Sequence, residues 1–133
     1  MVWQLMNDHN TELDRLRSIA EQGDASTQFK LGQMYELGID VVRDYVGALK
    51  WYGKAAQQNH AKAQYALGVM YLFGIGVIED EVMAHLWFNL AAAQGNKNAR
   101  EYRDMVATEM TPDQIAEAQR LAREWKPVTA RTK

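Results

Sequence analysis

Few residues in this chain have the type and spacing that chemistry requires, and the most suggestive is a short glycine-containing stretch. Gly74-Ile75-Gly76 follows an apolar run, as the phosphate loop of a nucleotide-binding protein does. Such a loop also needs a preceding β-strand and a third glycine, and thirty-six residues upstream the same stretch carries Asp40 in place of Gly76. The sequence therefore argues against a phosphate or dinucleotide site.

The other reactive side chains form no catalytic or metal-binding arrangement. The chain has no cysteine, which excludes thiolate zinc sites and cysteine nucleophiles. His9, His60 and His85 share no metal-ligand spacing, and His60 lies at a predicted surface turn. The serines are only Ser18 and Ser26, with no histidine and acid arranged around them. We therefore expect no catalytic residue, no metal ligand and no cofactor, and we expect that the protein is not an enzyme.

Two groups of acidic residues have structural explanations. The segment 79–81 is Glu-Asp-Glu at a predicted helix start, where negative charge is favourable because the first N–H groups of a helix are unpaired. Glu117 and Glu124 lie three and four residues from Arg120, a spacing that predicts ion pairs on the exposed face of one helix. We interpret both groups as surface charge rather than as catalytic carboxylates.

Composition indicates one folded domain. Of 133 residues, 47% are hydrophobic and 24% are charged, and the formal net charge of −2 provides no basic surface for nucleic acid. The uncharged apolar stretch that ends at Glu79 is shorter than the roughly 20 residues of a membrane span. The N-terminal residues lack the basic and apolar regions of a signal peptide. We therefore expect a cytoplasmic protein, or a periplasmic or secreted one if an export signal has been removed.

An internal repeat shows which elements must position these residues. Residues 25–60 and 61–96 align without a gap and are identical at sixteen of thirty-six positions, and a fixed period of this length is typical of stacked repeats. The identical positions recur at helical spacing, for example at Leu31 and Tyr35. Each unit is therefore predicted to be a pair of helices.

Glycine and aspartate residues mark the ends of these helices. Gly38 and Gly74 are predicted to end the first helix of each unit, because glycine readily adopts the left-handed conformation that closes a helix. Asp44 and Asp80 are predicted to cap the start of the second helix. The Gly-Ile-Gly-Val stretch is therefore interpreted as a connector between two helices.

Two further glycines, Gly32 and Gly68, lie inside the predicted first helices, where glycine costs about 1 kcal/mol relative to alanine. We expect close packing against alanines of the facing second helix to offset this cost. Trp51 and Trp87 lie in register with that alanine stripe and are expected in the core.

Extending the period outward divides the chain. We expect about seven helices and no sheet, with the last helix beginning at Thr111-Pro112 in a capping box closed by Gln114. The expected divisions are an N-terminal extension over 1–8, a repeat domain over 9–125 and a polar tail over 126–133. The repeat domain comprises a leading half unit at 9–24, full units at 25–60 and 61–96, and a divergent unit at 97–125.

The repeated residues resemble a known family. The pattern Ala, Leu-Gly, Met-Tyr, Gly-Ile-(Gly)-Val, Asp, Ala, Trp, Ala-Ala and Gln-Gly closely resembles Sel1-like repeats, the longer relatives of tetratricopeptide repeats, over about residues 12–125. Asp40 and Asn59 depart from it by replacing loop glycines. The resemblance implies an all-α, right-handed α-α superhelix, an α-solenoid that serves bacteria as an adaptor or scaffold. Its cysteine-rich branch is linked to penicillin binding and hydrolysis, which this cysteine-free chain does not lead us to expect.

The resemblance also implies where a partner binds, because tetratricopeptide-like arrays bind ligands on a concave face lined by the first helix of each pair. Carried over to this chain, that face comprises Phe29, Gln33, Glu36, Lys62, Tyr65, Val69, Leu72, Phe73, Asn98, Glu101 and Met105. The alternative for Phe29 and Tyr65 is that they fill gaps between neighbouring helices.

The expected function is therefore a non-catalytic adaptor, monomeric or weakly dimeric, that binds a protein or peptide and no nucleic acid. The alternative is a small bacterial immunity or inhibitor protein that captures one toxic effector, since compact Sel1-like proteins resemble some of those. Less favoured is a hydrolase related to the cysteine-rich branch.

Overall fold

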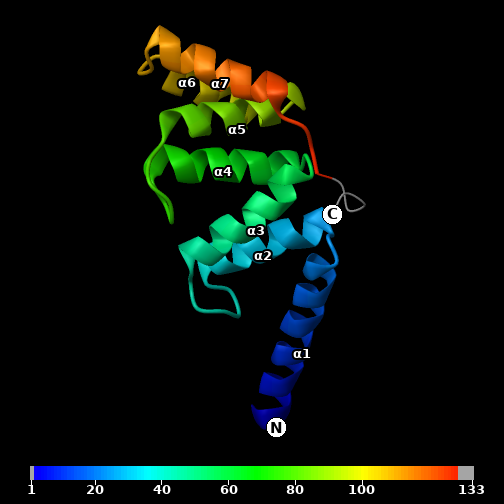
Figure 1. Ribbon diagram of the computed structural model, residues 1–133. Coiled ribbons are helices and arrows are strands. Elements are labelled where there is room, and N and C mark those ends of the chain that lie inside the picture. Colours follow the sequence, from blue (N-terminus) through cyan, green and yellow to red (C-terminus); the bar gives the residue numbers. More distant parts are fainter. Residues whose placement is uncertain (1, 129–133) are drawn as a thin grey trace.

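The computed structural model describes residues 2–128, and the side chains of residues 12–128 (Figure 1). This part of the chain is all-α, as predicted, and consists of seven helices stacked into a solenoid. The helices are α1 (Val2–Glu21), α2 (Ala25–Leu37), α3 (Tyr45–Gln57), α4 (Ala61–Phe73), α5 (Glu81–Ala93), α6 (Lys97–Ala107) and α7 (Pro112–Glu124).

The observed helix ends confirm the predicted capping residues. Gly38 and Gly74 end α2 and α4 with φ of 69° and 65°, the left-handed region that glycine adopts without strain. Asp44 and Asp80 each accept a hydrogen bond from the backbone N–H three residues further on, at the start of α3 and α5. The capping box of α7 is present as predicted. Gly74-Ile75-Gly76 is therefore a helix connector.

The core runs through the stack as a series of hydrophobic clusters between neighbouring hairpins. Trp51 and Trp87 are 6% and 4% exposed, as the repeat predicted. Trp87 packs with residues of α3 and α4, whereas Trp51 packs with Leu16 and Leu31 from the preceding pair of helices. Because each cluster draws on adjacent units, no hairpin buries its apolar face alone.

Buried glutamines tie one unit to the next. The Gln64 side chain is fully buried, and its Nε2 donates to the carbonyl oxygen of Ala56 at 3.3 Å. Its Oε1 accepts a hydrogen bond from Nε2 of Gln94 at 2.9 Å. Gln28 repeats both contacts one unit earlier. The two glutamines that recur at the repeat period therefore form a ladder along the seam between units.

The expected packing of Gly32 and Gly68 against alanines is wrong. A Cβ on Gly32 would lie 2.5 Å from Cδ1 of Tyr52, and a Cβ on Gly68 would lie 2.5 Å from Cδ1 of Phe88. An aromatic ring of the second helix lies over each glycine. The space left by the missing side chain holds that ring.

Both ends of the chain differ from the sequence-based outline. α1 begins at Val2, so the described part of the predicted 1–8 extension is helical, and this helix projects away from the stack (Figure 1). After α7 the chain turns back, and the N–H of Val128 donates to the carbonyl of Gln57 in α3 at 2.6 Å. The predicted tail is thus tied to the array as far as residue 128, and residues 129–133 lie outside the described part.

None of the helices in residues 2–128 combines the length and the apolar character needed to span a membrane.

Candidate protein-binding groove

The first helices of the pairs line a groove with a volume of about 420 Å³, which we call the central groove. Seven of the predicted residues line it: Phe29, Gln33 and Glu36 from α2; Lys62, Tyr65 and Val69 from α4; and Asn98 from α6. Three helices that are distant in sequence thus contribute to one hollow.

The other four predicted residues lie elsewhere. Glu101 and Met105 line a separate depression of about 210 Å³ on α6. Leu72 is half-buried and packs against the hydrophobic clusters of the C-terminal units. Phe73 is 60% exposed at the end of α4 and does not line the central groove.

Phe29 and Tyr65 line the groove and also fill gaps between helices. The Phe29 ring lies 5.5 Å from the Tyr52 ring, between ring centroids. The Tyr65 ring lies 5.9 Å from Phe88 and 5.8 Å from Tyr102. The two interpretations left open by the sequence are therefore compatible, because one face of each position meets neighbours and another meets the hollow.

Sequence reasoning missed three lining residues: Tyr52, Ala66 and Asn96. Tyr52 belongs to α3 and is 2% exposed, yet its hydroxyl reaches the groove and donates to Oε1 of Glu36 at 2.5 Å. Burial and this contact raise the pKa of Tyr52 far above its usual range, so the hydroxyl stays protonated and remains a donor.

The sequence offers only a weak signal for this pair. One period further on, Tyr52 and Glu36 are replaced by Phe88 and Leu72, so the hydroxyl and the carboxylate disappear together. Because twenty of the thirty-six aligned positions differ between the two units, this joint replacement does not by itself identify a contact.

The two histidines whose side chains are described lie at a helix cap and in the core. His60 caps α4, and its Nδ1 accepts a hydrogen bond from the N–H of Ala63 at 3.2 Å, with its pKa lowered by burial and then by Lys62. His85 is 4% exposed, and its Nδ1 has no hydrogen-bond partner among the described residues. The His9 side chain lies outside the described part. Within that part, no group of three or more histidine and acidic side chains is placed to hold a metal ion.

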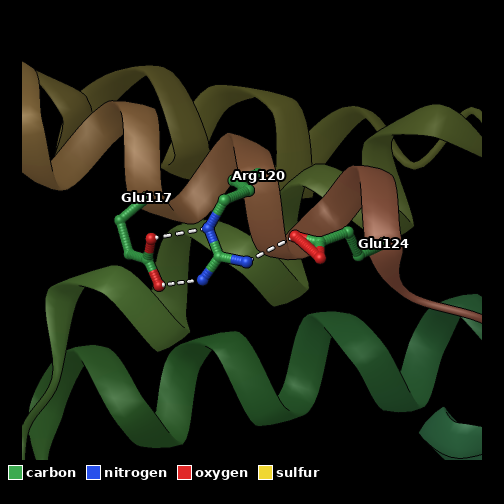
Figure 2. Close-up of polar contacts among 3 residues, drawn as sticks. All are labelled: Glu117, Arg120 and Glu124. Carbon is green, nitrogen blue, oxygen red and sulfur yellow. Dashed lines mark hydrogen bonds and ion pairs between the residues drawn. The ribbon is translucent and has the colours of Figure 1, made fainter.

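The acidic residues of α7 form surface ion pairs. Figure 2 shows the Arg120 guanidinium between Glu117 and Glu124. Arg120 Nε and Nη2 donate to the two oxygens of Glu117 at 2.9 and 2.7 Å, and Nη1 donates to Glu124. All three side chains are exposed on one helix face, as the spacing predicted.

Comparisons with known proteins agree with this architecture. A family model described as Sel1 repeat matches residues 25–60 and 61–96. The crystal structure of a Sel1 repeat protein from Oxalobacter formigenes is 41% identical, with a TM-score of 0.68, and the match covers 69% of this chain and 69% of that one.

A second similar structure is that of a protective antigen present in uropathogenic Escherichia coli strains, which displays an SLR fold. It is 33% identical with a TM-score of 0.80, and the match covers 83% of this chain. The chain spans 24% of the antigen's length. Among curated proteins, none matches the chain.

Proposed function

Because this chain belongs to the Sel1 repeat family, we propose that it is a non-catalytic module whose central groove binds a segment of a partner protein. Sel1 repeats typically serve protein interaction. The observation that carries the proposal is the convergence of α2, α4 and α6 on one hollow lined by aromatic, amide and charged side chains.

This lining suits a peptide segment. Phe29 and Tyr65 provide apolar surface that is already held in place by packing, so little side-chain entropy is lost when a partner covers it. Gln33 and Asn98 are exposed and offer amide groups that pair with a peptide backbone. Interfaces of this composition commonly have their binding energy concentrated in the aromatic anchors.

The proposal is tested by blocking the groove without disturbing the core. Lys62 is exposed and lines the groove, so Lys62→Trp places a large ring across the hollow. Lys54 is exposed on α3 and is not among the groove residues, so Lys54→Trp makes the same chemical change away from it. Both variants should retain the helical circular dichroism spectrum of the wild type.

Affinity capture from the native cell then distinguishes the two surfaces. We expect wild type and Lys54→Trp to recover the same partner and Lys62→Trp to lose it. Recovery of that partner by all three proteins would place the binding surface outside the groove. Tight one-to-one capture of a single protein would support an inhibitor, and weaker capture of several extended peptides would support an adaptor.

A further inference from the structure

We propose that Glu36 makes the central groove a site for a basic side chain, an arginine or a lysine presented by the partner protein. The inference rests on the proposed function, because it names the chemistry of the segment that the groove binds.

The first argument is the state of the Glu36 carboxylate. The side chain is half-buried, and its one hydrogen-bond donor among the described residues is the neutral hydroxyl of Tyr52. Lys62 lines the same groove but forms no ion pair with Glu36 in the described part of the chain. A partly buried negative charge without a cation gains more from an incoming ammonium or guanidinium group than an exposed one does.

The second argument is the surface around the carboxylate. The half-buried rings of Phe29 and Tyr65 line the groove with Glu36, and aromatic faces attract cations as well as methylene groups. The long stem of an arginine or lysine is apolar, so it can lie along these rings while its charged end reaches the carboxylate. An acidic or purely apolar side chain would use only part of this lining.

The third argument is the internal comparison between the repeats. Phe88 lies over Gly68 just as Tyr52 lies over Gly32, and the hairpin of the second unit needs neither a hydroxyl nor a carboxylate there. The equivalent of Glu36 in that unit is Leu72. The Glu36–Tyr52 pair is therefore more than the packing of a repeat requires, and it places a negative charge on the part of the central groove that the first unit lines.

Lys62 carries a positive charge in the same groove and therefore opposes the binding of a cation. This allows a second test with the opposite expected result. It is exposed, so solvent screens it more strongly than the half-buried Glu36. It reduces the attraction of the groove for a cation without cancelling it. Removing the Lys62 charge should therefore strengthen cation binding, whereas removing the Glu36 charge should weaken it.

The probes are three capped tripeptides, acetyl-glycyl-X-glycine amide, in which X is arginine, its uncharged isostere citrulline, or glutamate. Each is titrated into the full chain labelled with ¹⁵N, and amide shifts are followed by NMR. We expect saturable shifts at Phe29, Glu36 and Tyr65 with the arginine peptide, and binding about tenfold weaker with citrulline. The glutamate peptide should give no saturable shift in the groove.

Variants connect the binding to the carboxylate. Glu36→Gln keeps an acceptor for Tyr52 and should weaken the arginine peptide about tenfold, with an unchanged melting temperature. Lys62→Gln should strengthen it. Glu109→Gln removes the same charge from an exposed site in the turn between α6 and α7, which is not among the groove residues, and should bind like wild type.

Three results would overturn the inference: no saturable shift with the arginine peptide, equal binding of arginine and citrulline, or unchanged binding by Glu36→Gln. If one of these occurs while Lys62→Trp still loses the cellular partner, the groove remains a protein-binding site and only the assigned chemistry is wrong. If Lys62→Trp retains the partner, the proposed function itself fails.

Discussion

The Phe88 ring lies directly against the backbone of Gly68, where a Cβ would come within 2.5 Å of both Cδ1 and Cε1 of the ring. Carbon atoms of separate side chains prefer about 3.5–4.0 Å, so the ring can occupy this position only because residue 68 has no side chain. Tyr52 and Gly32 repeat the relationship in the first unit. In each full repeat, the two helices thus pack through an aromatic ring of the second helix that lies against a glycine of the first.

Gly68→Ala should therefore destabilise the protein even though alanine favours helix. Overpacking a core typically costs about 1–3 kcal/mol, and the helix propensity gained is about 1 kcal/mol. We expect a net loss of about 1 kcal/mol in the free energy of unfolding, measured by urea denaturation. Gly53→Ala is the matched control, because no atom lies within 4 Å of a Cβ at that helical position. It should stabilise, and equal stabilisation by Gly68→Ala would show that the ring yields easily.

Gln64→Met should destabilise by breaking the ladder at the seam between units. The change removes the donor to Ala56 and the acceptor for Gln94 while nearly keeping the volume of the side chain. A hydrogen bond typically contributes about 0.5–1.5 kcal/mol net, and at least two are lost here, so we expect the free energy of unfolding, measured by urea denaturation, to fall by about 1–3 kcal/mol. Gln119→Met, on the exposed face of α7, should change the free energy of unfolding by less than about 0.5 kcal/mol. A similar small change for Gln64→Met would mean that the ladder contributes little.

Trp125→Ala should loosen the segment that returns from α7 to α3. The Trp125 ring lies 6.2 Å from Trp87 in an edge-to-face arrangement and packs on the core cluster of the middle units. Loss of a half-buried aromatic side chain should lower the free energy of unfolding by about 2 kcal/mol. The N–H of Val128 should also exchange faster with deuterium, because its bond to Gln57 depends on the position of the segment. Lys126→Ala changes an exposed neighbour and should alter neither the stability nor the exchange rate. Unchanged exchange of the Val128 N–H in Trp125→Ala would show that its hydrogen bond does not depend on the packing of Trp125 against Trp87.

His85 should make stability depend on pH. Burial, and then the neighbouring Arg103, lower its pKa below the usual 6.5, and Asp104 opposes them only in part. The unfolded chain therefore binds the proton more readily, and the stabilisation is complete above about pH 6.5 and is lost as the pH falls toward the lowered pKa.

Unfolding measured between pH 7.5 and pH 5 tests this contribution. His85→Leu should lose less stability over that interval than the wild type does. His60 also has a lowered pKa, so His60→Asn, which keeps a side-chain acceptor at the cap as Asn96 does, separates its share. An identical loss of stability in wild type and His85→Leu would assign the pH dependence to other groups.

The ion pairs of α7 should matter little. Arg120 holds Glu117 and Glu124 on an exposed helix face, where solvent and salt screen the attraction (Figure 2). We expect Glu117→Gln to leave the melting temperature unchanged within experimental error at physiological salt. A clear decrease would show that the pair contributes more than its exposure implies.

Much of the fold follows from the sequence alone, because it depends on local rules that repeat. Glycine and aspartate at fixed offsets set where α2 and α4 end and where α3 and α5 begin, and the helical spacing of Trp51 and Trp87 places them in the core. Seven of the eleven residues assigned to the binding face do line one groove, since a helix face is set by its period. Leu72 does not line it, because it packs against the hydrophobic clusters of the C-terminal units. Phe73 is exposed at the last position of α4, outside the groove.

Contacts between residues far apart in the chain were decided only by the tertiary structure. The sequence placed alanines against Gly32 and Gly68, and the structure placed rings there, because helix rotation about its axis depends on packing between helices. The Tyr52 hydroxyl reached Glu36 across sixteen residues for the same reason. Periodicity determines which side of a helix is apolar, whereas the fit of whole side chains determines which atoms meet and therefore which charge faces the groove.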